Sequence, residues 1–224
     1  MKIENLELKP KDIENVALQV SEILINLECV KFRINPPFTY SAGLESPVYT
    51  DNRLILSSPE DRENIASLLT DLVMIKTSNV DVIAATATAG IAHAAYIAYN
   101  LYLPLVYINP RQKGYGQQKQ IEGKILKGQK AVVIDDHIST GMSSLIAVKA
   151  IRDEGAHVSD VIAITTYGLN EAEINFKNNN IKLHTLTDLA HLCNVALKKG
   201  LISQQEISII NNWSQNPNSW QKPK

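Results

Sequence analysis

The sequence has little of what marks a secreted or a metal-binding protein. It contains only two cysteines, Cys29 and Cys193, without disulfide or metal-site spacing, so a reducing cytoplasm is the expected location. Its first residues, MKIENLELKPKD, include no apolar segment of the signal-peptide type. The chain also lacks an excess of charge, since its formal net charge is −1. Such a balance gives no electrostatic reason to expect nucleic acid as a partner.

Charged residues are also absent from one long internal segment, Val82 to Asn109. A segment of this length raises the question of a membrane span. The residues that interrupt its apolar character are Thr86, Thr88, Gly90, His93, Asn100 and Pro104. We therefore expect a strand, a loop, a helix and a second strand inside a globular core, and no contact with a membrane.

The segment richest in chemistry is KAVVIDDHISTGMSS, from Lys130 to Ser144. Its apolar run, Ala131 to Ile134, predicts a buried parallel strand. Two carboxylates end that predicted strand, a turn of small residues follows, and apolar residues at helical spacing come next. The polar and small residues between the strand and the body of the helix include Asp135, Asp136, Ser139, Thr140, Gly141 and Ser143.

These residue types suit a sugar phosphate. A loop that enters a helix presents unpaired N–H groups and the positive end of the helix dipole, and its hydroxyls add donors to a phosphate. The carboxylates of Asp135 and Asp136 repel a phosphate but can accept hydrogen bonds from ribose hydroxyls one sugar-width away. Ribose 5-phosphate therefore fits both ends. The same order of elements also occurs in other doubly wound folds, where the acids bind a metal or cap a helix.

This segment resembles the phosphoribosyl diphosphate (PRPP) signature of the type I phosphoribosyltransferases, in which an apolar strand precedes two acids, [ST]-x-G and small hydroxyl residues. The resemblance implies that Asp135 and Asp136 are catalytic and hold the 2′ and 3′ hydroxyls of the ribose. It also implies that the loop wraps the 5′-phosphate. The PRPP contacts that it implies in this segment are Asp135, Asp136, His137, Ile138, Ser139, Thr140, Gly141, Met142 and Ser143.

Residues 32–56 predict a small β flap, with short strands at Phe38 to Tyr40 and Val48 to Thr50. The flap resembles the pattern F-x-x-x-x-G-x-x-S-P-x-Y-x-D-x-R of the orotate phosphoribosyltransferases. The residues that match this pattern are Phe38, Gly43, Ser46, Pro47, Tyr49, Asp51 and Arg53. The resemblance therefore narrows from phosphoribosyltransferases in general to the branch that uses orotate.

Within the flap, the ring of Phe38 offers a flat apolar wall for a pyrimidine. Without the family resemblance, a plain core residue of the flap is an equal alternative for Phe38. Asp51 and Arg53 are expected to form an internal ion pair rather than to contact substrate. Ser41 stands where many family members have a lysine, so one cationic contact is missing or supplied elsewhere. Ser139, in the phosphate loop, is the expected second contact with orotate.

The turn ATATAG, Ala85 to Gly90, lies between an expected strand and an expected helix. Small residues permit close backbone approach, so the N–H groups of this turn could hold the leaving pyrophosphate. The resemblance places PRPP contacts at Thr86, Ala87 and Thr88, and a tight packing turn is the alternative. His93 on the following helix is expected to be a satisfied core or surface histidine rather than a catalyst.

The segment NPRQKGYGQQKQIEG, Asn109 to Gly123, combines basic side chains with glycines, as expected of a loop that can close over a diphosphate. It resembles the mobile catalytic loop of the family. Lys113 matches the catalytic lysine, and Tyr115 matches a His/Tyr position that contacts PRPP. The resemblance implies a homodimer in which loop 109–120 completes the neighbouring subunit's site.

The loop departs from the family pattern at its start. Asn109, which remains an expected PRPP contact, replaces an arginine, and Pro110 replaces a lysine or serine. Arg111 lies in the same loop and could take over part of the missing charge. By itself, the segment would read as an ordinary solvated basic loop.

Alternating strands and helices over residues 80–185 predict an α/β fold with a doubly wound parallel sheet, whose ligands bind at the carboxyl ends of the strands. A helix is expected near residues 12–28, and further helices over residues 186–224. We expect a single phosphoribosyltransferase domain, 1–224, consisting of the flap, this α/β core and the C-terminal helices.

The expected activity is that of an orotate phosphoribosyltransferase, which uses PRPP and orotate with Mg²⁺. The ion would be held mainly by PRPP, near Asp135 and Asp136. A phosphoribosyltransferase for another nucleobase is one alternative. A catalytically weak PRPP-sensing regulator is the other, although no helix-turn-helix motif or basic face is evident.

Overall fold

The computed structural model describes residues 10–39, 45–110 and 120–221. Its helices are α1 (Pro10–Asn26), the 3-10 helix η1 (Asn52–Ser57), α2 (Pro59–Lys76), α3 (Ala89–Leu101), α4 (Met142–Asp153), α5 (Asn170–Asn178), α6 (Leu189–Lys198) and α7 (Gln204–Gln215). Its strands are β1 (Val30–Phe32), β2 (Phe38–Thr39), β3 (Glu45–Ser46), β4 (Val48–Thr50), β5 (Val82–Thr86), β6 (Leu105–Ile108), β7 (Ile121–Glu122), β8 (Lys130–Ile138), β9 (His157–Thr166) and β10 (Lys182–Asp188).

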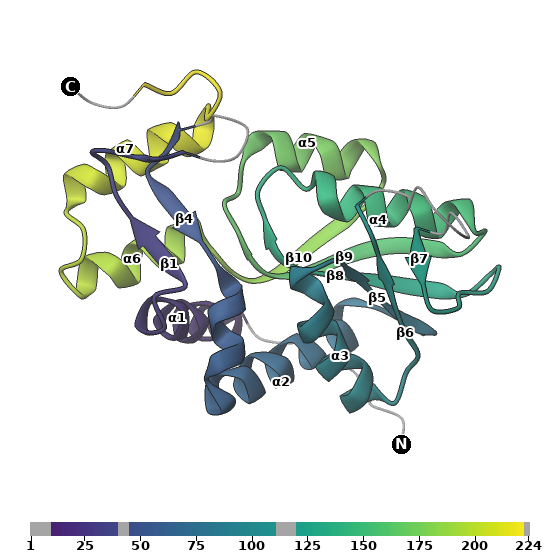
Figure 1. Cartoon of the computed structure of the whole chain (residues 1–224). Coiled ribbons are helices and arrows are strands. Elements are labelled where there is room, and N and C mark those ends of the chain that lie inside the picture. Colours follow the sequence, from purple (N-terminus) through teal and green to yellow (C-terminus); the bar gives the residue numbers. More distant parts are fainter. Residues whose placement is uncertain (1–9, 40–44, 111–119, 222–224) are drawn as a thin grey trace.

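A six-stranded sheet forms the centre of the molecule, with the strand order β10-β9-β8-β5-β6-β7 (Figure 1). Neighbouring strands are parallel except at one edge, where β7 runs antiparallel to β6. All five residues of β5 are buried, because helices cover both faces of the sheet. The predicted α/β class with a doubly wound, largely parallel sheet is confirmed.

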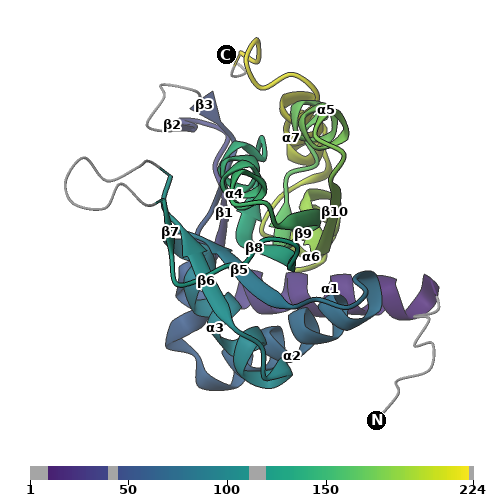
Figure 2. The same ribbon diagram turned by 90° about the vertical axis from the view of Figure 1, so that its right-hand side faces the viewer.

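Two apolar layers lie on opposite faces of this sheet. Side chains alternate along β8, so that Val132 and Ile134 join one core cluster while Ala131 and Val133 join the other. The first cluster includes residues of α1, α2, α3, α6 and α7, and the second includes residues of α4 and α5. Figure 2 shows α1, α2 and α3 together on one side of the sheet.

A smaller unit precedes the central sheet and corresponds to the predicted flap. It consists of two antiparallel pairs, β1 with β4 and β2 with β3, followed by η1. Strand β1 lies directly between the end of α1 and the rest of this unit. The flap is tied to the C-terminal helices, since the Trp213 indole N–H donates to the main-chain oxygen of Glu45 at 3.1 Å.

Several predicted elements are found at their predicted positions. The second strand expected within residues 82–109 is found as β6, and α2 runs from Pro59 to Lys76. Ser58 precedes that helix, although its hydroxyl donates to Asp61 Oδ2 at 2.6 Å instead of capping the backbone. None of the helices within the described ranges combines the length and the apolar character that crossing a bilayer requires.

Candidate functional site

The acid pair lies where the central sheet narrows. Pairing between β5 and β8 ends at Ala85 and Ile134, whereas pairing between β8 and β9 continues to Ile138 and Thr166. The prediction that Asp135 and Asp136 end the strand is therefore wrong. Both residues are part of β8, because β9 continues to offer main-chain partners after β5 has turned away.

Asp135 is buried, with 4% of its surface exposed. Its Oδ2 atom accepts hydrogen bonds from the hydroxyls of Ser144 at 2.6 Å and Ser143 at 3.1 Å, and its Oδ1 accepts from the Asp136 N–H at 2.9 Å. A buried carboxylate needs such donors to remain ionised. In this structure Asp135 therefore ties the first turn of α4 to β8.

Ser144 is a site residue that sequence reasoning missed. It lies on the buried side of α4, in line with Ala147, Val148 and Ile151 at helical spacing. The available signal in the sequence was a serine on an otherwise apolar face of the helix, a few residues after the two acids.

Asp136 remains partly accessible, in contrast to Asp135. Burial, followed by the neighbouring negative charge of Asp135, raises the pKa of its carboxyl to about 7. The charged form of such a carboxyl is destabilised in the free protein. A ligand that donates hydrogen bonds to it, or that brings a cation, stabilises the charged form. Asp136 is thus the member of the pair that is better placed to meet a ligand.

The phosphate-type loop is supported from behind by α5. Gly141 has a φ of 78°, and an ideal Cβ at this position would lie 2.7 Å from the ring of Phe176. Asn175 Nδ2 donates to the main-chain oxygen of Thr140 at 3.0 Å. No side chain caps α4 at Gly141, so the first N–H groups of the helix keep their capacity for an anion. Sequence reasoning missed Asn175 and Phe176, which lie 35 residues further along the chain.

Two other predicted PRPP contacts in β8 are mainly internal. Ile138 is fully buried, and its main-chain oxygen accepts from the Thr166 hydroxyl at 3.2 Å and the Tyr167 N–H at 3.0 Å. The ring of His137 packs edge-on against Tyr167, with centroids 4.1 Å apart. A ligand could therefore contact these two residues only through atoms that do not already contact Thr166 or Tyr167.

The turn between β5 and α3 has fewer free donors than its sequence indicates. The Thr86 hydroxyl donates to the main-chain oxygen of Ile134 at 3.3 Å, and the N–H of Ala87 donates to Ile108 at 2.9 Å. The peptide bond between Ala87 and Thr88 is cis. The N–H groups that this turn can offer to an anion are therefore those after Ala87, at Thr88 and at the start of α3.

Gly90 at the start of α3 touches the strand that carries the acids. An ideal Cβ at this position would lie 2.7 Å from both the Ile134 main-chain oxygen and Thr86 Oγ1. Gly90→Ala is therefore expected to lower the free energy of unfolding by about 1–3 kcal/mol, measured by urea denaturation. Glycine to alanine within a helix normally stabilises it, so an increase in stability would contradict this close packing.

His93 of α3 is a core residue, as expected, with 1% of its surface exposed. Burial lowers the pKa of its imidazole to about 4. Its Nε2 atom is buried without a hydrogen-bond partner within the described part of the chain, so the expectation that it is fully satisfied is wrong.

In the flap, Phe38 is partly buried between two neighbours. The Arg33 guanidinium lies 4.3 Å from the centre of its ring, and the ring of Tyr49 lies 5.6 Å away in a tilted arrangement. Its role as a wall for a base remains a prediction. The expected ion pair is confirmed, since the Arg53 guanidinium donates to both carboxylate oxygens of Asp51, at 2.6 and 2.8 Å.

The two ends of the predicted catalytic loop are held together. The Asn109 N–H donates to the main-chain oxygen of Gln120 at 2.9 Å, and Gln120 Nε2 donates back to the Asn109 oxygen at 3.0 Å. These bonds extend the β6–β7 pair at the edge of the sheet. The predicted residues Arg111, Lys113 and Tyr115 lie outside the described residues, as do the flap residues Ser41 and Gly43.

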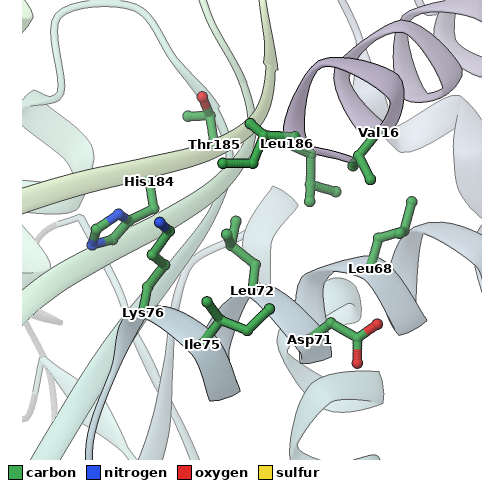
Figure 3. A pocket seen from close by; sticks show the side chains of 10 residues that line it. Val16, Leu68, Asp71, Leu72, Ile75, Lys76, His184, Thr185 and Leu186 are labelled. Atoms are coloured by element: carbon green, nitrogen blue, oxygen red, sulfur yellow. The ribbon is translucent and has the colours of Figure 1, made fainter. Parts of the chain in front are cut away.

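A separate apolar pocket of about 220 Å³ lies between α1, α2 and β10 (Figure 3). Val16, Leu68 and Leu72 form part of its wall, and Lys76 lies near His184 at one end. Its lining includes no residue of the acid pair, the phosphate loop or the turn before α3. This pocket therefore does not belong to the candidate site.

Comparisons with known proteins identify the family of this chain. Residues 55–189 match the family described as the phosphoribosyl transferase domain. The chain is 43% identical to the orotate phosphoribosyltransferase of Listeria innocua, over 93% of this chain and all of the relative. It is 44% identical to that of Staphylococcus saprophyticus, over 90% and 99%. The crystal structure of orotate phosphoribosyltransferase from Aeropyrum pernix superposes with a TM-score of 0.70 at 26% identity, covering 82% of this chain and 99% of that one. The chain therefore belongs to the orotate phosphoribosyltransferases, within the phosphoribosyltransferase family.

Proposed function

We propose that this protein transfers the 5-phosphoribosyl group of PRPP to orotate, giving orotidine 5′-phosphate and pyrophosphate in pyrimidine synthesis. The likeness to relatives named orotate phosphoribosyltransferase, over almost their whole length, supports this activity. The structural observation that carries it is the acid pair at the uncapped start of α4, where Asp135 accepts from Ser143 and Ser144 and the next residue, Asp136, remains partly accessible. A sugar hydroxyl and a phosphate can be met there at the same time.

The ribose 5-phosphate part of PRPP is bound between the loop and the acids. The 5′-phosphate accepts hydrogen bonds from the N–H groups at the start of α4 and from the hydroxyls of Ser139 and Thr140. The ribose hydroxyls donate to Asp136 first, because Asp135 already accepts three hydrogen bonds. This binding fixes the sugar carbon C1 relative to the sheet.

The reaction breaks the bond between C1 and the pyrophosphate and leaves positive charge on the sugar ring. Negative carboxylates beside the ring stabilise that charge. The departing pyrophosphate is met by the N–H groups at the start of α3 and by Lys113, with Asn109 or Arg111 beside it. Closure of loop 109–120 excludes water, which would otherwise compete with orotate for C1.

Mg²⁺ would be held mainly by PRPP, rather than by a site of the protein alone. Among the described residues, no three His, Cys, Asp or Glu side chains are grouped as a metal site. Asp135 is also occupied by its internal donors, so Asp136 is the acid left to approach the ion. Held mainly by the oxygens of PRPP, which are the hard ligands that Mg²⁺ prefers, the ion would supply neutralisation of charge on the leaving group.

Orotate is placed against the flap, with Phe38 as its apolar wall and Ser139 as a hydrogen-bonding partner. The protein acts as a homodimer in the cytoplasm, and loop 109–120 of each subunit completes the site of the other. Two hydrogen bonds join Asn109 and Gln120, the ends of that loop, at the edge of the sheet.

Orotate consumption with PRPP and Mg²⁺ tests the activity. Wild type is expected to consume orotate and to leave uracil and purine bases unchanged. Lys113→Ala is expected to lower kcat by about 10²-fold or more, because the leaving group loses its cation. Lys182→Ala is the control, since this exposed lysine begins β10 at the opposite edge of the sheet. Tight PRPP binding without orotate loss in wild type would favour the sensor instead.

Lys113→Ala also tests whether loop 109–120 completes the site of the neighbouring subunit. Lys113→Ala and Asp136→Asn are each expected to be almost inactive alone. Mixed dimers recover one complete site if Lys113 acts on the neighbouring subunit, so mixing after reversible dissociation is expected to restore activity. If mixing restores no activity although mixed dimers form, loop 109–120 serves its own subunit.

A further inference from the structure

The main chain at Asp136 is held by a side chain from the flap. After Ile134 the strand β8 has no further pairing with β5, and side-chain donors take over on its carbonyl groups. The Thr86 hydroxyl bonds the oxygen of Ile134, and Asn52 Nδ2 bonds the oxygen of Asp136 at 2.8 Å. Asn52 belongs to η1, which follows the flap strands, and is fully buried.

The orientation of the Asn52 amide is fixed by its partners. A main-chain oxygen can only accept, so the nitrogen of the amide must face Asp136. The same nitrogen donates to Thr165 Oγ1 on β9 at 3.1 Å. The amide oxygen is buried and has no partner within the described residues. The hydrogen bonds of the Asn52 side chain are therefore made by its nitrogen, while its buried oxygen carries the cost of burial without compensation.

Thr165 extends the contact to a second residue of β8. Its hydroxyl oxygen shares a hydrogen bond of 2.7 Å with His137 Nδ1. Since the hydroxyl accepts from Asn52, its own proton can be donated to His137. Asn52 and Thr165 thus hold the two consecutive residues Asp136 and His137, one by its main chain and one by its ring.

We propose that Asn52 is a positioning residue, which sets the direction of the Asp136 carboxylate by holding its peptide group against β9. This inference rests on the role proposed above for Asp136. The bond falls on the peptide of the acid itself, so a small displacement there moves the carboxylate relative to the ribose. Displacements of this kind lower catalysis strongly even when the fold is unchanged.

The isosteric variant Asn52→Asp removes both donated hydrogen bonds and places an acceptor against the Asp136 oxygen. It is expected to lower kcat/KM for PRPP by 10- to 100-fold, while KM for orotate changes less than 3-fold. By titration calorimetry, ribose 5-phosphate is expected to bind at least 10-fold more weakly, and inorganic phosphate with unchanged affinity. A purely structural role would weaken both ligands or neither.

Thr165 supplies a second pair of variants in case Asn52→Asp does not fold. Thr165→Val removes the hydroxyl that joins Asn52 to His137, and is expected to lower ribose 5-phosphate affinity in the same selective way. Thr165→Ser keeps the hydroxyl and is expected to bind within 3-fold of wild type. Asn100→Asp is the matched control, because Asn100 Nδ2 also donates to a threonine hydroxyl, that of Thr70, at 3.1 Å, far along α3.

Asp136→Asn separates this inference from the proposed function. If Asp136→Asn weakens ribose 5-phosphate binding and Asn52→Asp does not, the positioning role is wrong while the site stands. If Asp136→Asn itself leaves the affinity unchanged, the proposed role of Asp136 fails, and the inference fails with it. Selective loss in Asn52→Asp, Thr165→Val and Asp136→Asn, with recovery in Thr165→Ser, supports the inference.

Discussion

Asp136→Asn is expected to lower kcat by 10²- to 10³-fold and, at pH 8, to make the protein more stable. The loss of activity follows because an amide cannot stabilise positive charge on the sugar as a carboxylate does. The gain in stability follows because the carboxylate is partly buried beside Asp135, which raises its pKa to about 7. The variant removes that unfavourable charge and keeps the shape of the side chain.

The pH dependence has a defined direction. Burial beside Asp135 raises the pKa of Asp136 to about 7 in the folded protein, from about 3.9 in an unfolded chain, so the folded state holds the proton more tightly. The corresponding stability is complete below about pH 4 and is lost as the pH rises through 7. Asp136→Asn should therefore raise the free energy of unfolding at pH 8 by roughly 2–4 kcal/mol relative to its effect at pH 4.

Urea denaturation at both pH values measures this difference. Asp153→Asn is the control, because Asp153 is exposed and pairs only with Lys149 among the described residues. An equal effect of Asp136→Asn at the two pH values would show that Asp136 is not held in a strained, partly buried environment. Unchanged kcat in the same variant would remove Asp136 from the catalytic site.

Asp135→Ala is expected to lower the free energy of unfolding by about 3 kcal/mol or more and to abolish activity. The substitution leaves the buried Ser144 hydroxyl without its 2.6 Å acceptor and also releases Ser143 and the Asp136 N–H. Buried donors that lose a charged acceptor are costly to the folded state. The start of α4 then loses its attachment to β8, so the phosphate loop and the acid pair lose their relative position.

Two milder variants separate charge from attachment. Asp135→Asn keeps an oxygen that can accept from Ser144, so it should lose less stability than Asp135→Ala. Ser144→Ala removes one of the three donors and is expected to cost about 1 kcal/mol. Thermal and urea denaturation measure these effects. Equal stability of Asp135→Ala and Asp135→Asn would contradict a role for this carboxylate as the link between β8 and α4.

The regular elements could be predicted because their signals are local. Helix α2 begins at a Ser-Pro pair and ends at Lys76, and β6 is a short apolar run between a proline and an asparagine. The length of β8 could not be predicted in this way. The residues before its final Ile138 are polar, and they remain in the strand because β9, some 30 residues further along the chain, pairs with this part of β8.

The contiguous residues of the candidate site could be located in the sequence for the same reason. The residues that support them could not. Asp135, Asp136 and the loop that follows are contiguous, so their order alone indicates a sugar phosphate. The residues that hold them come from elsewhere in the chain. Asn52 lies 84 residues before Asp136, and Asn175 lies 35 residues after Thr140. Asn52 stood between the matched residues Asp51 and Arg53, yet no local pattern indicates that its side chain reaches β8.

A crystal structure with bound ribose 5-phosphate and Mg²⁺ tests the central claim most directly. The phosphate should lie against the loop from Ser139 to Ser143 at the start of α4, with a ribose hydroxyl within 3 Å or so of the Asp136 carboxylate. The Asn52 amide should still hold the Asp136 oxygen in that complex. A ribose whose hydroxyls lie away from both aspartates, or a phosphate bound elsewhere on the sheet, would contradict the account.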